Sequence, residues 1–151
     1  MSAAPTRCGE ILLVEDSLKD ARLIREVLSE QGHRHHLQVA RDGEEALHRL
    51  RGEAPYAGSP RPDLVLLDVN LPSLSGIEVL SCIKCDPQLK HLPVLMLSTS
   101  RAERDVADSY ARHANGYLVK PASYDEFAAL IELTLAFWLE HAQPPTRQSA
   151  S

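Results

Sequence analysis

Five short apolar runs recur along the chain, and each is bounded by polar or turn-forming residues. With their flanks they cover residues 10–14, 37–40, 64–67, 93–97 and 115–121. A short apolar run between turn signals is typical of a strand that is buried on both faces. The pattern therefore predicts five strands, of which the third ends abruptly at Asp68.

Apolar residues at helical spacing separate these runs. Ala21, Ile24, Val27 and Leu28, for example, share one face of a helix that ends near Gln31. Five helices are predicted, over residues 17–31, 44–50, 76–84, 101–113 and 124–141. Strands that alternate with helices indicate an α/β fold with a parallel sheet and right-handed crossovers.

The size and charge of the chain narrow its class. Its 151 residues fit one domain, which we place at residues 10–142, between a flexible N-terminal tail (1–9) and a polar C-terminal tail (143–151). The net charge of −5 gives no reason to expect nucleic acid as a partner. The sequence has neither a run of about 20 apolar residues nor the apolar core of a signal peptide, so no membrane contact is expected. Three cysteines, an odd number, favour a reducing, cytoplasmic location.

Polar side chains follow the predicted strands at the point where each strand ends. Glu15 and Asp16 follow the first strand, and Asp68 ends the third. In a doubly wound sheet of order 2-1-3-4-5, the first and third strands are neighbours, about 4.8 Å apart. Carboxylates this close repel one another unless a cation lies between them. Because the candidate ligands are all oxygens, the expected cation is Mg²⁺.

The remaining strand ends supply groups that suit phosphoryl chemistry. Ser98 and Thr99 follow the fourth strand, and Lys120 ends the fifth. A carboxylate such as that of Asp68 can attack phosphorus and form an aspartyl phosphate. Lys120, the Ser98 hydroxyl and Mg²⁺ would stabilise the charge on the transferred group.

These stretches resemble the receiver domain of two-component response regulators. The resemblance covers residues 10–142 and implies a flavodoxin-like (βα)5 fold of strand order 2-1-3-4-5. The matching stretches are Val14-Glu15-Asp16, Leu66-Leu67-Asp68-Val69-Asn70-Leu71-Pro72 with Ser75-Gly76, Pro93-Val94-Leu95-Met96-Leu97-Ser98 and Gly116-Tyr117-Leu118-Val119-Lys120-Pro121.

The resemblance implies a role for each site residue. Asp68 would accept a phosphoryl group from a sensor histidine kinase. Asp16 would bind Mg²⁺ directly, Glu15 mostly through water, and Asn70 through its backbone carbonyl. The remaining roles are phosphoryl binding by Ser98 and Lys120, and a rotamer of Tyr117 that follows the state of Ser98.

Three positions depart from the commonest family pattern. Glu15 stands where an aspartate is usual, and Ser98 replaces a threonine. Thr99 stands where a small residue is frequent, which narrows access to the phosphoryl group. We expect these departures to change rates, while the assignment of the family remains the same.

A finer resemblance links the chain to small single-domain regulators of phytochrome-type light-sensing kinases. It rests on residues 15–24, 55–57, 98–106 and 137–139. It implies a phosphorylation-dependent change of contacts with an unknown downstream protein. A phosphate sink, or an intermediate in a relay for another kinase, is the alternative.

Two further readings compete with a phosphorylated switch. A phosphatase of the haloacid dehalogenase type also uses a strand-end aspartate, but it needs a second acid where Asn70 stands. A receiver that serves only as a scaffold would not need its full set of site residues. We therefore expect a phosphoacceptor and no enzyme.

The last predicted helix carries apolar residues on more than one face. Phe127, Leu130, Ile131, Thr134 and Trp138 form the stripe expected to cover the sheet, and four others fall elsewhere: Leu133, Leu135, Phe137 and Leu139. A surface helix on a single sheet needs one apolar face, so a second one predicts a partner surface. We expect a homodimer through Leu133, Phe137 and the fifth-strand side of the sheet.

Overall fold

The computed structural model describes residues 9–30 and 35–142, which form a five-stranded parallel sheet flanked by helices. Numbered by their order along the chain, the strands follow one another in the sheet as 2-1-3-4-5, as expected. Both predicted tails fall wholly or almost wholly outside the described residues, as does Gln31 at the end of the first helix. Within the described ranges, no helix has the length and apolar character needed to cross a membrane.

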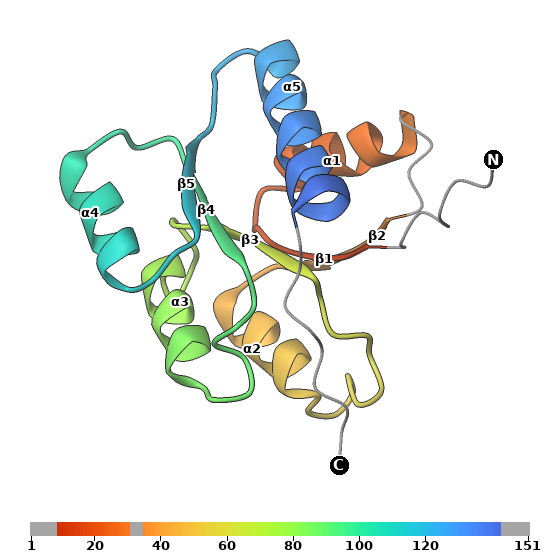
Figure 1. Ribbon diagram of the computed structural model, residues 1–151, viewed down its shortest axis with the longest axis vertical. Helices are drawn as coiled ribbons and strands as arrows, with labels where there is room; N and C mark the ends of the chain where they lie inside the picture. The colour runs from red at the N-terminus through yellow and green to blue at the C-terminus, as the bar shows by residue number, and fades with distance from the viewer. Residues whose placement is uncertain (1–8, 31–34, 143–151) are drawn as a thin grey trace.

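The strands and helices alternate along the chain (Figure 1). The strands are β1 (Glu10–Val14), β2 (His36–Ala40), β3 (Leu64–Asp68), β4 (Val94–Ser98) and β5 (Gly116–Val119). The helices are α1 (Leu18–Glu30), α2 (Gly43–Arg51), α3 (Gly76–Cys85), α4 (Glu103–Ala111) and α5 (Tyr124–Leu135), and a π-helical segment, η1 (Ala136–His141), continues α5. α4 is shorter at both ends than the helix expected over 101–113. It begins after Ala102, whose side chain makes no capping hydrogen bond.

Alternate residues of each central strand face opposite sides of the sheet and build two separate cores. Leu13, Leu66 and Leu97 pack with α1 and α5 on one face. Leu12, Leu67 and Met96 pack with α2 and α3 on the other. Because β3 and β4 are buried at every position, their carboxyl ends are held between two helical layers.

The C-terminal helix differs from its expected form in two ways. Leu135, predicted to lie off the sheet-facing stripe, is fully buried, because it follows Phe127 and Ile131 at intervals of four residues. The expected continuous α-helix to residue 141 instead ends at Leu135 and becomes π-helical. Leu133 and Phe137 lie on the surface as expected, with 71% and 56% of their area exposed.

A glycine fixes the approach of α3 to the end of β3. A Cβ on Gly76 would clash with the carbonyl oxygen of Asp68 and would lie 2.7 Å from the Cα of Val69. Only a residue without a side chain therefore fits beside the backbone that carries Asp68. Ser75 and Glu78 form a capping box that fixes the first turn of this helix.

Candidate phosphoacceptor site

Asp68 lies at the centre of a buried polar cluster at the carboxyl end of the sheet. It is the last residue of β3 and is almost fully buried. Its Oδ1 accepts a hydrogen bond of 3.0 Å from the backbone N–H of Asn70. Its Oδ2 accepts one of 3.2 Å from Lys120 Nζ. Asp68 is thus held by a turn on one side and a cation on the other.

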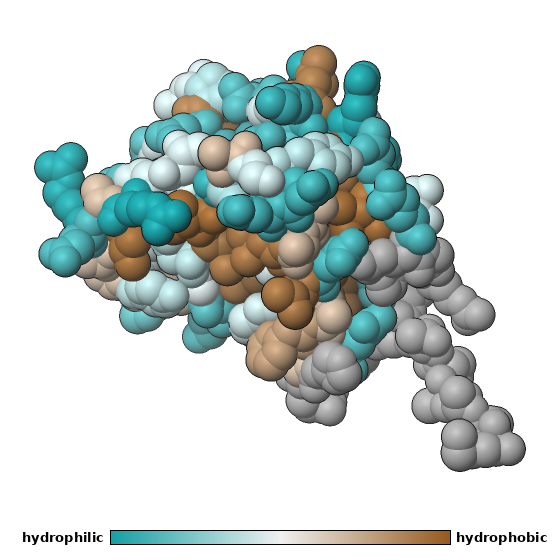
Figure 2. Space-filling model, turned by 90° about the horizontal axis from the view of Figure 1, so that it is seen from above, coloured by the Kyte–Doolittle hydropathy of each residue, from teal (hydrophilic) through white to brown (hydrophobic). Residues whose placement is uncertain are grey.

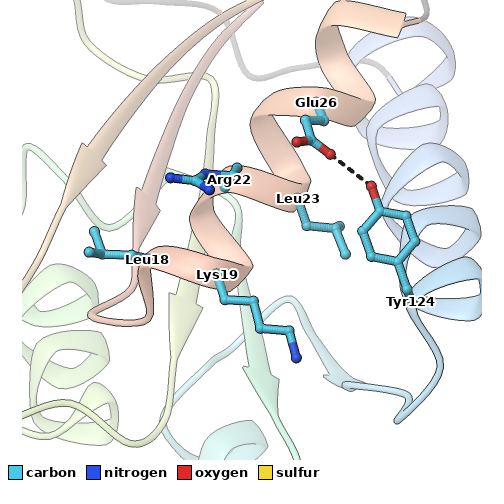
Figure 3. A pocket seen from close by; sticks show the side chains of 6 residues that line it. All are labelled: Leu18, Lys19, Arg22, Leu23, Glu26 and Tyr124. Carbon is cyan, nitrogen blue, oxygen red and sulfur yellow. Dashed lines mark hydrogen bonds between the residues drawn. The ribbon is translucent and has the colours of Figure 1, made fainter.

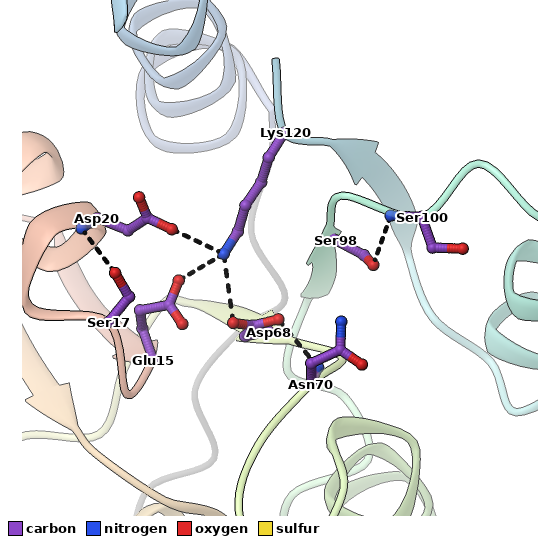
Figure 4. A network of polar contacts seen from close by, with 8 residues as sticks. All are labelled: Glu15, Ser17, Asp20, Asp68, Asn70, Ser98, Ser100 and Lys120. Carbon is purple, nitrogen blue, oxygen red and sulfur yellow. Dashed lines mark hydrogen bonds and ion pairs between the residues drawn. The ribbon is translucent and has the colours of Figure 1, made fainter. Parts of the chain in front are cut away.

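Lys120 reaches from the end of β5 across β4 to the carboxylates on the β1 side of the sheet. Its Nζ lies 2.6 Å from Glu15 Oε1, 2.9 Å from Asp20 Oδ2 and 3.2 Å from Asp68 Oδ2. Figure 4 shows these three carboxylates converging on the ammonium group. Burial acts to lower the pKa of Lys120, but the hydrogen bond and charge of Glu15, the hydrogen bond to Asp20 and the charge of Asp68 raise it overall. Lys120 therefore stays protonated.

The surroundings of Glu15 stabilise its ionised form poorly. Burial, followed by the neighbouring carboxylate of Asp68, raises the pKa of Glu15 to about 8, although Lys120 opposes the shift. Its Oε2 is buried and has no hydrogen-bond partner among the described residues. A buried carboxylate oxygen without a partner lowers the stability of the folded protein, and a cation bound to this atom would offset that loss.

Three carboxylates can supply that cation with ligands. One oxygen each of Glu15, Asp16 and Asp68 lies within 4.8 Å of the other two. Asp16 is exposed, so its side of the cluster is open to solvent, whereas Glu15 and Asp68 are buried. An all-oxygen set that leaves room for water suits a hard divalent ion such as Mg²⁺. The donor set and the unpartnered Glu15 oxygen therefore fit a divalent cation.

Apart from Lys120, the predicted phosphoryl-binding and switch residues lie on the β4 side of Asp68. Ser98 is fully buried at the end of β4, and its Oγ accepts a 3.0 Å hydrogen bond from the backbone N–H of Ser100. Tyr117 donates its hydroxyl hydrogen to the Ser100 carbonyl, at 3.1 Å. Thr99 and Asn70 are both exposed beside the site. Figure 4 places Ser98 on the side of Asp68 opposite Asp20.

Sequence reasoning missed Asp20 as a member of this cluster. The backbone N–H of Asp20 donates a hydrogen bond to Ser17 Oγ, at 3.2 Å, as in a helix cap. The Asp20 carboxylate, however, accepts from Lys120. Its place in the first turn after β1, at the same sheet edge as Asp16, was the available signal.

A pocket of about 310 Å³ opens between α1 and α5, next to the cluster but not within it. Figure 3 shows the Tyr124 hydroxyl reaching Glu26, to which it donates a 2.8 Å hydrogen bond. The lining residues are Leu18, Lys19, Arg22, Leu23, Glu26 and Tyr124. The pocket therefore adds no group to the chemistry at Asp68.

Comparisons with known proteins agree with this geometry. The family model of the response regulator receiver domain matches residues 11–132. The chain therefore belongs to the response regulator receiver family.

Individual relatives narrow the likeness further. The chain is 45% identical, over 89% of its length and 92% of the relative's, to the response regulator Rcp1 of Synechocystis sp.. The crystal structure of the phosphorylated cyanobacterial phytochrome response regulator RcpA superposes with a TM-score of 0.89 at 44% identity, covering 93% of this chain and 100% of that one. The Mn²⁺-bound form of Rcp1 matches with a TM-score of 0.86 at 44% identity, covering 91% and 99%. The chain is thus similar to phytochrome response regulators.

Proposed function

We propose that this protein is a cytoplasmic response regulator whose receiver domain, residues 10–142, accepts a phosphoryl group on Asp68. One Asp68 oxygen would form a bond to phosphorus while the bond from phosphorus to the donor breaks and the donor keeps the electron pair. The observation that carries the proposal is Lys120 Nζ, 3.2 Å from Asp68 Oδ2, in a cluster whose other carboxylates can hold a cation. Asp68 is itself modified, so the protein is a phosphoacceptor with no turnover on a separate substrate.

The roles of the surrounding groups follow from their positions. Glu15, Asp16, Asp68 and the Asn70 carbonyl would hold Mg²⁺, which supplies charge neutralisation when bound. Lys120 and the Ser98 hydroxyl would bind phosphoryl oxygens from opposite sides. The Ser98 hydroxyl now accepts from the Ser100 amide, so turning toward a phosphoryl group would remove that bond. Tyr117, bonded to the same Ser100, would then respond, and Thr99 would limit access.

The direct test is intact-mass spectrometry after incubation with acetyl phosphate and Mg²⁺. The unmodified protein should gain one phosphate, about 80 Da, while Asp68→Asn gains none. EDTA in the incubation should prevent the adduct. Absence of an adduct on the wild type with this donor, and again with a phosphorylated histidine kinase, would overturn the proposal.

The proposed phosphate donor is a phytochrome-type sensor histidine kinase. Support comes from the 45% identity to Rcp1 and from the match to RcpA, a phytochrome response regulator. An autophosphorylated phytochrome kinase should transfer labelled phosphate to the wild type faster than a kinase of another sensor class does. Equal rates from both would favour a general sink or relay role.

The proposed output is a change of contacts with a downstream protein, made by a homodimer. Leu133 and Phe137 are exposed apolar side chains on the last helix, and β5 is the half-buried edge strand of the sheet. Figure 2 shows a broad hydrophobic area on one face of the molecule. Burying such surface in a second copy of the chain would remove it from water.

Sedimentation velocity of variants tests the interface. Phe137→Glu and Leu133→Glu should give folded monomers, because each would bury an unpaired charge at the contact. Leu18→Glu is the matched control, since this leucine is 65% exposed on α1, outside the proposed interface. A dimer that persists in both the Leu133→Glu and the Phe137→Glu variant would place the contact elsewhere.

A further inference from the structure

Lys120 has its hydrogen-bonding capacity fully used by three carboxylates. A lysine ammonium group has three N–H donors. The acceptors within 3.2 Å are Glu15 Oε1, Asp20 Oδ2 and Asp68 Oδ2, each from a different element or element end. The side chain is about nine-tenths buried, so solvent offers little competition. The direction of the third N–H, toward Asp68, is therefore set by the two other carboxylates.

Glu15 and Asp20 both accept a hydrogen bond from Lys120, but only Glu15 can also be a metal ligand. Glu15 belongs to the three carboxylates that can hold a cation, and its Oε2 has no partner among the described residues. A divalent ion at that place would compete with Lys120 for the negative charge of Glu15. Asp20 is not in that group. Its backbone is fixed by the Ser17 side chain in the first turn of α1, where a helix N-terminus also favours a negative charge. Asp20 is thus an anchor for Lys120 that metal binding leaves in place.

We propose that Asp20 is a positioning residue for phosphoryl transfer: it holds Lys120 Nζ so that one N–H points at Asp68. The inference rests on the proposed function. Lysine has a long flexible stem, and its rotamer freedom must be removed before the ammonium group can meet a phosphoryl oxygen reproducibly. Figure 4 shows the continuous chain of contacts from Ser17 through Asp20 and Lys120 to Asp68.

The test is the rate constant of phosphorylation by acetyl phosphate at saturating Mg²⁺. Asp20→Ala removes both charge and acceptor and should lower the rate constant about tenfold, whereas Asp20→Asn keeps an acceptor oxygen and should lower it less. The Mg²⁺ dissociation constant should change by less than about threefold in both, since Asp20 is not a ligand. A rate increase, or a loss explained by weaker Mg²⁺ binding, would overturn the inference.

Glu126 provides a matched control. It occupies the third position of α5, as Asp20 does in α1, and its N–H is bonded to the side chain of a serine cap, Ser123. It is exposed and contributes no oxygen to Lys120 in the described contacts. Glu126→Ala and Glu126→Gln should leave the rate constant unchanged. A similar loss in both helices would mean that helix capping, rather than contact with Lys120, explains the effect.

A double-mutant cycle isolates the contact itself. If Asp20 acts through Lys120, Asp20→Ala should have no further effect in the Lys120→Met background. In parallel, the ¹⁵N-detected side-chain signal of Lys120 in the metal-free protein should broaden or shift in Asp20→Ala and remain unchanged in Glu126→Ala. If the wild type is phosphorylated and both readouts match the control, the Asp20 inference fails while the proposed function stands.

Discussion

The two ends of the sheet each hold a partly buried lysine, and the two are used in opposite ways. At the carboxyl end, Lys120 lies among the carboxylates of Glu15, Asp20 and Asp68. At the amino end, Lys84 Nζ donates to neutral oxygens: the carbonyls of Lys90 (3.1 Å) and Leu92 (2.7 Å), and the side-chain oxygen of Asn115 (3.0 Å).

Their electrostatic environments differ accordingly. Burial lowers the pKa of Lys84, because its partners carry no charge to offset the loss of solvent. The pKa of Lys120 is raised, because carboxylates outweigh the same burial penalty. Lys84 therefore joins loops and strand ends through hydrogen bonds to neutral oxygens. The single positive charge of Lys120, by contrast, faces three carboxyl groups, so an excess of negative charge remains around Asp68. The Lys84 contact needs no further partner, whereas the carboxylates beside Lys120 can still hold a cation.

The largest expected effect comes from removing Lys120. In Lys120→Met, the buried carboxyl groups of Glu15 and Asp68 and the partly buried one of Asp20 lose their counter-charge. The free energy of unfolding should therefore fall by about 3–5 kcal/mol without divalent ions. Urea denaturation measures this, and millimolar Mg²⁺ should recover part of the loss. A loss that Mg²⁺ leaves unchanged would show that the ion does not share the role of Lys120.

Removing Lys84 should cost less. Lys84→Met takes a donor away from three oxygens, at a cost of about 1–3 kcal/mol in the free energy of unfolding. The Asn115 side-chain oxygen keeps a second donor, the Val94 N–H at 2.9 Å. Because these acceptors are neutral and remote from Asp68, the loss should be the same with and without Mg²⁺ in urea titrations. Recovery by Mg²⁺ would contradict the distinction between the two ends.

The excess charge also predicts that a divalent ion stabilises the wild type. At Mg²⁺ tenfold above its dissociation constant, the gain should be about 1.4 kcal/mol, visible as a rise in melting temperature. Asp16→Asn and Asp68→Asn should reduce this gain, because each removes a ligand oxygen charge. Asp86→Asn, at the C-terminal end of α3, serves as the control and should keep the full gain.

The smallest effect is a difference in pH dependence above neutral pH. The folded pKa of Lys84 lies below its ordinary value of 10.5, so between these two values the unfolded chain binds more protons and stability rises with pH. The pKa of Lys120 lies above 10.5 when folded, so its contribution is full below 10.5 and is lost as pH rises above it. Stability differences of Lys84→Met and Lys120→Met from wild type should therefore change with opposite slopes, measured by urea denaturation. Equal slopes would contradict the assignment of opposite charge environments.

Much of the sheet could be predicted because its strands are buried on both faces. Continuous apolar runs leave little freedom in assigning β3 and β4, and the turn residues after them define their ends. Helices were harder at their ends: α4 has no side-chain cap, and its predicted bounds were wrong at both ends. The position of Leu135 was also predicted wrongly. An apolar residue in a helix with several apolar faces can be assigned as buried or exposed only when the layer that packs against the helix is known.

For the site, the sequence by itself determined which chemical groups stand at the strand ends: Glu15, Asp16, Asp68, Ser98 and Lys120. Their order along a parallel sheet was enough to bring the carboxylates together. Only the tertiary structure decided that Asp20 shares Lys120, because that contact joins the start of α1 to the end of β5, 100 residues apart. Only it decided that Glu15 keeps a buried oxygen without a partner. Such pairings depend on side-chain reach and burial across layers, which no local pattern in a chain encodes.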